Sequence, residues 1–571
     1  MALFTEAGVR GAVVRLPRLP DDDSARALSV PSMSRRPSFS QAGLRLPRWV
    51  WATAIIVSLV RLIPFWHAEI QTPAGWSFTG NIDGSGDMMQ YRAWMRQAQE
   101  TGPLVTNKFT PEPTDPFIPV VLYWVVGGLS KITGVSAEYV YTYLGSLFAL
   151  ALIVTLYWTL SLFLSNTRQV RWAFLAILVG GGLGAHFRVI AAAADRLDST
   201  FFSALAQSVR TLPVLENDRG HYVVTTIFDT HFLYIWLIVT LAVLATYSVV
   251  RRPTVQGALL LVVADAVVTI SHIYSGVNLV AVTAAVLFCV KGRSPGGGAR
   301  WALAITVLTV AVVGGVQLLL YKSSTLPTPN WSTAVYPHEL FLAFPLAWIL
   351  LVAGRRWFLR EGGLRERFVA GWLLGCTVLA LSAPVYPYAE RATITLQIPL
   401  YFATIAIYFG LFGWQRWWVG VVAVTILCGT PAIMVHDLWV STSFSDDKPY
   451  VFESTDHRAI IERLGQDARS TDVLLVEKSG RSRRHADLWL APEFPGRMYR
   501  SHFFLTARYS ERVRKVEMFF AGTPGEQLRF LQHANIRFIF VDSATLEARL
   551  EQVPGIVLLT KNSAGALYRY G

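Results

Sequence analysis

The stretch "FTGNIDGSGDMMQYRAWMRQAQETG", from Phe78 to Gly102, follows the first long apolar run of the chain. It carries two carboxylates, Asp83 and Asp87, beside glycines that let a backbone approach a ligand closely. The spacing of "DMMQ" is also that of a capping box, with Asp87 as the N-cap and Gln90 as the third helical residue. Asp87 therefore has either a functional role or a capping role, whereas Asp83 has no capping explanation.

The apolar runs around this stretch define the class of protein. Of the 571 residues, 53% are hydrophobic and 16% are charged. Apolar runs of about 17 to 25 residues, the length that crosses a bilayer as a helix, recur from Trp49 to Val435. We predict an α-helical polytopic protein of the inner (plasma) membrane. The formal charge of +13 comes from short basic clusters between the runs, which indicates cytoplasmic loops near anionic lipid and no nucleic-acid partner.

The basic clusters also predict the orientation of the chain. Four arginines precede the first run, so we expect a cytoplasmic N-terminus and an extracytoplasmic first loop at residues 66–139. Residues 117–135 should lie along the membrane interface, because a crossing there would place the arginine-rich loop at 355–367 outside. This leaves about 11 transmembrane helices, near residues 49–65, 140–164, 172–190, 222–250, 256–272, 273–290, 301–321, 338–353, 368–385, 396–412 and 417–436.

The chain divides into three predicted regions. Residues 1–46 lack hydrophobic periodicity and are expected to form a disordered cytoplasmic tail. Residues 47–438 form the transmembrane domain. Residues 439–571 are charged and turn-rich, and we predict a small extracytoplasmic α/β domain there. Its expected strands are "DVLLVEKS", "IRFIFVDS" and "GIVLLTKN", and its expected helices are "STDHRAIIERLGQDA", "SERVRKVEMFFAG" and "PGEQLRFLQHA".

Ionisable residues in or beside the spans are expensive to bury, which makes them candidates for function. With the orientation above they converge at the outer face, as a polar cavity opening outward requires. We expect Asp229 and His231 two or three turns inside a span, and His272 and Tyr274 at the turn between two spans. The other members of the set are Asp265, about two turns deeper than His272, Glu390 and Arg391, and the loop residues Glu216, Asp218, Arg219 and His221.

Each candidate has a chemical role and a simpler alternative. The guanidinium of Arg391 can neutralise a lipid phosphate, or it can anchor the chain at the interface beside Glu390. His272 can bind substrate, or it can only reach from a span end toward water. Asp83 and Asp87 can act as general base or hold a divalent metal, so Mg²⁺ or Mn²⁺ is a candidate cofactor.

The sequence resembles the GT-C superfamily of polytopic membrane glycosyltransferases. The resemblance rests on a long first loop that begins with an acidic segment (Asp83, Asp87, Tyr91), a following amphipathic helix, about 11 spans and a C-terminal extracytoplasmic domain. "SHIYSG", "ERATITLQIPLYFA" and "FPGRMYRSHFFLTARYSERVRKVEMFFAG" resemble a broad bacterial group of that superfamily. The compact Asp-Glu pair of the protein mannosyltransferases and the WWDYG-type signature of the oligosaccharyltransferases are not found in the sequence.

This resemblance implies transfer of a sugar from a polyprenyl-phosphate carrier to an acceptor hydroxyl outside the membrane, in cell-envelope glycan synthesis and with inversion at the anomeric carbon. The acceptor is a glycan, a lipid or a protein. The resemblance places the catalytic residue at Asp83 or Asp87. The implied substrate-binding residues are Tyr91, Asp229, His231, His272, Tyr274 and Arg391.

Two other functions stay open at this point. A transporter or flippase for a lipid-linked substrate would use Asp265, Asp229 and His231 as an ion or proton path. Inverted repeats would favour that function, and none is visible in the sequence. A catalytically inactive scaffold for envelope assembly would tolerate the loss of any single carboxylate.

Overall fold

The computed structural model of the chain describes residues 46–571 apart from a set of gaps. The gaps are 83–85, 165, 181–225, 324–336, 338–339, 342–343, 357–361, 383–384, 387, 413–428, 446–447, 449–450, 478–485 and 503–504. The predicted tail therefore lies outside the described residues, except for its last position. Asp83 and the loop residues Glu216 to His221 lie outside them as well.

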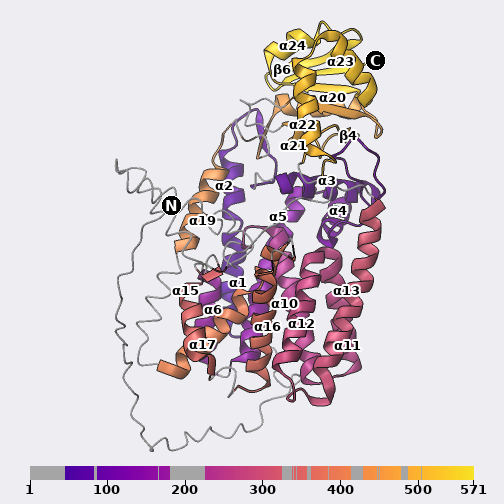
Figure 1. The fold of residues 1–571 in the computed structure, drawn as a ribbon. Helices are drawn as coiled ribbons and strands as arrows, with labels where there is room; N and C mark the ends of the chain where they lie inside the picture. The colour runs from indigo at the N-terminus through magenta and orange to yellow at the C-terminus, as the bar shows by residue number, and fades with distance from the viewer. Residues whose placement is uncertain are drawn as a thin grey trace, which may run out of the picture. The chain divides into compact units, whose positions relative to one another are not determined.

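Helices make up most of the described chain before residue 443 (Figure 1). Long apolar runs favour helices in a bilayer because every backbone N–H and C=O is then bonded within its own segment. The helices are α1 (Arg48–Val60), α2 (Ile63–Gln71), α3 (Gly86–Thr101), α4 (Val121–Thr133), α5 (Ala137–Phe163), α6 (Thr167–Val179), α10 (Thr230–Arg251), α11 (Val255–Ser271), α12 (Ile273–Cys289), η2 (Pro295–Gly297), α13 (Gly298–Ser323), α15 (Pro345–Arg356), α16 (Leu364–Ala380), η4 (Ala389–Thr393), α17 (Gln397–Phe412) and α19 (Gly429–Thr442).

Four helical segments among the described residues are long and apolar enough to cross a membrane, judged by length and composition. They are Arg48–Gln71, Ala137–Phe163, Thr230–Arg251 and Pro295–Leu320. Four further apolar helices are shorter. Five of the predicted spans overlap gaps in the described chain: 172–190, 222–250, 338–353, 368–385 and 417–436. The prediction of a helical polytopic chain agrees with these apolar helices, while the total of about 11 spans stays a prediction.

α10 lies at the centre of the helical part. It packs against α5, α11, α12 and α13, which lie beside it in Figure 1. Within its most apolar window 83% of the residues are buried, against 28% for the segment that contains α1. The exposed apolar side chains of α1, such as Ile56 and Leu59, are those expected on a lipid-facing helix. The N-terminal end of α10 is therefore enclosed by other helices.

α4 occupies the region predicted to lie along the interface. With 13 residues it is about 20 Å long, too short for a hydrocarbon core of about 30 Å. It packs closely on α3 through Gly127, where an added Cβ would lie 2.6 Å from the Met95 carbonyl oxygen and 2.7 Å from the Gln99 nitrogen. The adjacent Gly128 has no atom within 4 Å of the same position.

This pair of glycines gives a matched test of the α3–α4 contact. We expect Gly127→Ala to lower the stability of the protein by about 1 to 3 kcal/mol, because the new methyl group would collide with backbone atoms that cannot move away independently. Gly128→Ala should leave stability unchanged or raise it by up to about 1 kcal/mol, since alanine favours a helix. Thermal unfolding in detergent measures both, and equal unfolding midpoints for the two variants would contradict the close packing.

The C-terminal segment, defined here as residues 452–571, contains every strand of the described residues except β1 (Trp76–Phe78). Its elements are β2 (Phe452–Ser454), α20 (Thr455–Asp467), β3 (Val473–Val476), α21 (Ala486–Trp489), β4 (Arg497–Met498), α22 (Tyr509–Ala521), α23 (Pro524–Ala534), β5 (Phe538–Val541), α24 (Ala544–Leu550), β6 (Ile556–Asn562) and β7 (Gly565–Tyr570). The three stretches predicted as strands contain β3, β5 and β6. Two of the stretches predicted as helices contain α20 and α23, and the third contains α22 except for its first residue, Tyr509.

Five of these strands form one mixed sheet in the order β4-β3-β5-β7-β6. β3 is parallel to β4 and β5, with Leu474 opposite Phe538, while β7 runs antiparallel to β5 and β6. Side chains from β3, β5 and β7 pack with α22 and α23 in a single apolar core that includes Leu475, Phe519 and Leu531. The burial of all four residues of β3 and of β5 explains why both read as continuous apolar runs in the sequence.

The C-terminal segment is joined to the first loop. β1 pairs antiparallel with β2, so that Trp76 lies opposite Ser454. Residues Arg48–Gly571 form one contact unit. The boundary predicted at 438/439 and the extracytoplasmic placement of the segment remain predictions.

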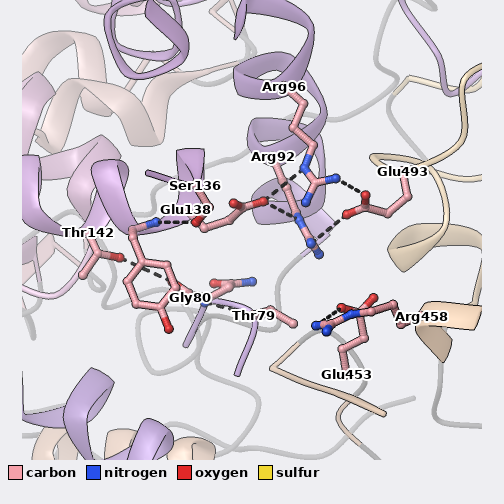
Figure 2. Close-up of polar contacts among 12 residues, drawn as sticks. Thr79, Gly80, Arg92, Arg96, Ser136, Glu138, Thr142, Glu453, Arg458 and Glu493 are labelled. Carbon is pink, nitrogen blue, oxygen red and sulfur yellow. Dashed lines mark hydrogen bonds and ion pairs between the residues drawn. The ribbon is translucent and has the colours of Figure 1, made fainter. Parts of the chain in front are cut away.

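Besides the pairing of β1 with β2, an ion-pair network connects the C-terminal segment to α3 (Figure 2). Arg92 Nε lies 2.7 Å from Glu138 Oε1, and Arg92 Nη2 lies 2.7 Å from Glu493 Oε1. Arg96 contacts the same two carboxylates. Both glutamates and Arg92 are nearly buried, so loss of one member would leave an uncompensated charge in a low-dielectric setting.

Candidate functional site

Asp87 lies in the first turn of α3 and faces the C-terminal segment. α3 begins at Gly86, so the prediction that Asp87 is the N-cap of this helix is wrong. A carboxylate in a first turn still gains from the helix dipole. Its Oδ1 lies 3.3 Å from His502 Nε2, at an ion-pair distance without the alignment of a hydrogen bond, and its side chain is 49% exposed.

The surroundings of Asp87 keep it charged. Partial burial opposes its ionisation, but His502, Arg391 and His231 together outweigh this effect and lower the pKa of Asp87 below its usual value. At neutral pH the group is therefore a carboxylate that can accept a proton. Of the three, Arg391 on η4 brings a positive charge close to Asp87 from a separate part of the chain.

An aromatic stack extends from Asp87 into the helices. Tyr91 stacks on Tyr123 of α4 with ring centroids 4.8 Å apart and on His231 of α10 with centroids 5.0 Å apart. The Tyr123 hydroxyl lies 2.9 Å from His231 Nδ1, within hydrogen-bond distance. Burial and the nearby carboxylate of Asp87 raise the pKa of Tyr91 well above its usual value, so its phenol stays neutral.

A second run of rings continues from His231 toward η4. The His272 ring lies edge-on to His231 at 6.1 Å and to Tyr274 at 5.4 Å. Tyr274 in turn lies 4.0 Å from Tyr388, measured between ring centroids. His272 Nδ1 is 2.8 Å from Ser275 Oγ, which orients the imidazole. The predicted convergence of His231, His272 and Tyr274 is therefore present in the structure.

Arg391 lies on η4 and brings a cation to the same group of residues. Its guanidinium carbon lies 5.6 Å from the centre of the Phe232 ring, on the first turn of α10. It is close enough to contribute to the charge environment of Asp87 and Tyr91. Arg391 is partly exposed, so a ligand can reach it. The side chain of Glu390, its predicted partner, lies outside the described residues.

Asp229 is placed differently from the prediction. We expected it two or three turns inside a span, but it is the N-cap of α10, and its Oδ1 accepts a hydrogen bond from the backbone nitrogen of Phe232 at 3.1 Å. The sequence suggested a longer span because apolar residues precede Asp229, whereas the capping carboxylate starts the helix at Thr230. Asp229 therefore has a structural role at the edge of the aromatic stack.

Two further buried charges lie in the helices around this region. Arg61, at the junction of α1 and α2, donates from Nη1 to the Thr142 carbonyl oxygen at 2.5 Å and from Nη2 to the Thr230 hydroxyl. Asp265 is fully buried on α11, and within the described part of the chain neither of its carboxylate oxygens has a hydrogen-bond partner.

The structure gathers most of the candidate residues. Asp87, Tyr91, His231, His272, Tyr274 and Arg391 form one cluster, which we call the Asp87 site, with Asp229 at its edge. Asp83 falls in a gap of the described chain. Among the described residues no group of three or more His, Cys, Asp and Glu side chains is arranged to hold a metal ion.

Sequence reasoning missed three members of the Asp87 site. Tyr123 and Tyr388 are aromatic residues with no charge to mark them, and many other tyrosines look the same in a sequence. His502 lies within "FPGRMYRSHFFLTARYS", a stretch that already supported the family resemblance. A histidine inside such a stretch was a usable signal, but nothing in the sequence related it to Asp87.

The comparisons with known proteins concern the fold. The archaeal oligosaccharyltransferase AglB from Archaeoglobus fulgidus, solved in complex with an inhibitory peptide and a dolichol-phosphate, aligns with a TM-score of 0.51 and 9% identity over 86% of this chain and 69% of AglB. ArnT from Cupriavidus metallidurans in the apo state covers 91% of this chain and 97% of its own at 11% identity, with a TM-score of 0.49.

The sequence comparisons add little to this. No family model matches the chain. The chloramphenicol-sensitive protein RarD of Pseudomonas aeruginosa is 26% identical over 163 residues, which cover 27% of this chain and 51% of RarD. The chain thus spans about half the length of this curated relative. The similarity to AglB carries the structural conclusion, which is that this chain shares its fold with AglB.

Proposed function

We propose that this protein is a membrane glycosyltransferase that moves a sugar from a polyprenyl-phosphate carrier to an acceptor hydroxyl on the extracytoplasmic side, in cell-envelope glycan synthesis. The observation that carries the proposal is the Asp87 site itself. A carboxylate, a cation and an aromatic wall meet at the enclosed end of α10, in a chain with the GT-C fold. This function requires two partners, a sugar donor linked to polyprenyl phosphate and an acceptor that is a glycan, a lipid or a protein.

The proposed reaction is a single displacement. Asp87 accepts the proton of the acceptor hydroxyl while the hydroxyl oxygen attacks the anomeric carbon of the sugar. The bond between that carbon and the phosphate oxygen breaks, and the polyprenyl phosphate leaves with the electron pair. Arg391 neutralises the departing phosphate, for which a guanidinium is well suited. One displacement inverts the anomeric centre.

The aromatic wall has a separate task in this proposal. The rings of Tyr91, Tyr123 and His231 pack face to face, and Tyr123 and His231 are buried, so they exclude water from the side of the carboxylate that faces the helices. Exclusion of water strengthens the attraction between Arg391 and a phosphate. A divalent metal, Mg²⁺ or Mn²⁺, would add Lewis acidity at the phosphate, and the described residues assign no ligand set to it.

The experiment that tests the proposal uses the purified chain in proteoliposomes with polyprenyl-phosphate sugars labelled in the sugar. A glycosyltransferase releases free polyprenyl phosphate and places the label on an acceptor from an envelope extract. A flippase makes the intact labelled lipid accessible on the opposite leaflet without breaking the bond. A scaffold does neither. Movement of intact lipid without bond cleavage would reject the proposal in favour of the flippase.

The predicted orientation has its own test. In a chain without its native cysteines, we expect Met518→Cys, at a side chain that is 72% exposed on α22, to react with a membrane-impermeant thiol reagent in intact cells. Lys291→Cys, in an exposed part of a basic cluster, should react only after permeabilisation, because basic clusters remain cytoplasmic. Labelling of position 291 from outside would overturn the orientation.

A further inference from the structure

His502 is a histidine of the C-terminal segment whose ring reaches Asp87. Its side chain is 0% exposed, and its Nε2 lies 3.3 Å from Asp87 Oδ1. The ring also lies edge-on to Phe109 of the first loop, with centroids 6.0 Å apart. The histidine is thus enclosed by protein, while the carboxylate that it contacts keeps an exposed side.

The turn that carries His502 is bonded to the first loop. The backbone nitrogens of Leu505 and Thr506 donate to the His502 carbonyl oxygen at 3.1 and 2.9 Å. The Thr506 hydroxyl donates to the Phe109 carbonyl oxygen at 2.7 Å, and the Asn107 amide donates to the Leu505 carbonyl oxygen at 2.8 Å. The position of His502 is therefore set relative to the first loop by several hydrogen bonds.

α3 is attached to the same C-terminal segment at a second point. Arg92 and Arg96, on the turns that follow Asp87, form the ion-pair network with Glu493 and Glu138 (Figure 2). In the first loop after α3, the Lys108 carbonyl oxygen also accepts a hydrogen bond from the backbone nitrogen of Met498 on β4, at 2.8 Å. Two attachments on one short helix restrict both its tilt and its rotation about its axis.

We propose that His502 is a positioning residue of the glycosyl-transfer site, which holds one oxygen of Asp87 so that the other faces the acceptor hydroxyl, and that the C-terminal segment thereby completes the site. The proposal rests on the function proposed above for Asp87. A carboxylate without a fixed neighbour populates several rotamers, and only a fraction of them faces the acceptor. A carboxylate that is already held in the reactive orientation does not have to be reoriented when the reaction occurs, so its whole population can act as the base.

The charges around the pair agree with this role. Arg391 on η4 and His231 on α10 also face Asp87, and Tyr91 is its neighbour one turn along α3. Arg391 can still supply positive charge to Asp87 after His502 is removed, but it lies on another element and cannot replace the contact of His502 with Oδ1. Loss of His502 should therefore impair orientation more than ionisation.

The test compares three variants of the full-length protein in proteoliposomes. We expect His502→Ala to lower kcat by roughly 10- to 100-fold, the range observed when a group that orients a functional ligand is removed. The KM for the polyprenyl-phosphate donor should change much less, since His502 is assigned no contact with the donor. His502→Gln should recover part of kcat, because its side-chain amide can still occupy the position beside Oδ1 of Asp87. His457→Gln is the matched control, a buried histidine of the same segment that bonds Ser454.

A double variant distinguishes the possible results. On an Asp87→Asn background, His502→Ala should cause little further loss of transfer, because it acts through Asp87. An equal loss on both backgrounds, or full kcat in both His502 variants, would overturn the positioning role. If Asp87→Asn alone retains full transfer, the proposed function of Asp87 fails instead. If His502→Ala does not fold, His502→Gln decides the outcome by itself.

Discussion

Asp87→Asn is expected to give a folded protein in which sugar transfer is slower by about 10²- to 10⁴-fold, the usual contribution of a positioned general base. Asparagine has nearly the same shape as aspartate, and loss of the favourable interaction of the carboxylate with the helix dipole costs only about 0.3 to 1 kcal/mol, so α3 should remain intact. It cannot accept a proton from the acceptor hydroxyl. Single-turnover transfer from a labelled polyprenyl-phosphate sugar measures the effect on the chemical step.

The control for this variant is Asp115→Asn. Asp115 is an exposed carboxylate of the same first loop, and its loss should leave transfer unchanged. Asp83→Asn belongs in the same series, since the sequence named Asp83 and Asp87 together. Wild-type transfer in a folded Asp87→Asn protein would reject Asp87 as the base. Loss of transfer in Asp83→Asn alone would move the base to Asp83.

Arg391→Ala is expected to weaken binding of the polyprenyl-phosphate carrier by roughly 10- to 100-fold, because a hydrogen bond to a charged group contributes about 1.5 to 3 kcal/mol. The phosphate would otherwise lie beside the rings of Phe232 and His231 without a cation to neutralise it. Arg391→Lys should retain part of the affinity, because lysine keeps the charge and loses the two-pronged geometry. Binding of a fluorescent polyprenyl phosphate in detergent gives the affinity directly.

Arg300→Ala controls for nonspecific attraction between a basic protein and an anionic lipid. Arg300 is exposed and lies in a different basic cluster of the chain. The Arg300→Ala variant should bind the carrier with the affinity of the wild type. If Arg391→Ala and Arg391→Lys both bind with wild-type affinity, then Arg391 serves only as an interfacial anchor, as the sequence alternative proposed.

Charge marked several of the candidate residues that the structure brings together. His231, His272 and Arg391 were selected because an ionisable group in an apolar setting is unusual; His231 and Arg391 lie near Asp87, and His272 contacts His231. The same criterion misplaced Asp229, since it cannot distinguish a carboxylate inside a helix from one that begins it. It also selected Asp265, which is buried away from the contacts of the Asp87 site in the described part of the chain.

What the sequence determined by itself was the membrane class, the apolar helices and six of the elements in the C-terminal segment. These features depend on local patterns, namely the length of an apolar run, its periodicity and the residues at its ends. Contact between the C-terminal segment and α3 was decided by the tertiary structure alone. Asn107 and Leu505 are hydrogen-bonded although 398 positions separate them, and β1 pairs with β2 across a similar distance. No local pattern encodes such pairs, because the side chains that meet there are selected by packing of the whole chain, and His502 therefore reaches Asp87 only in the folded protein.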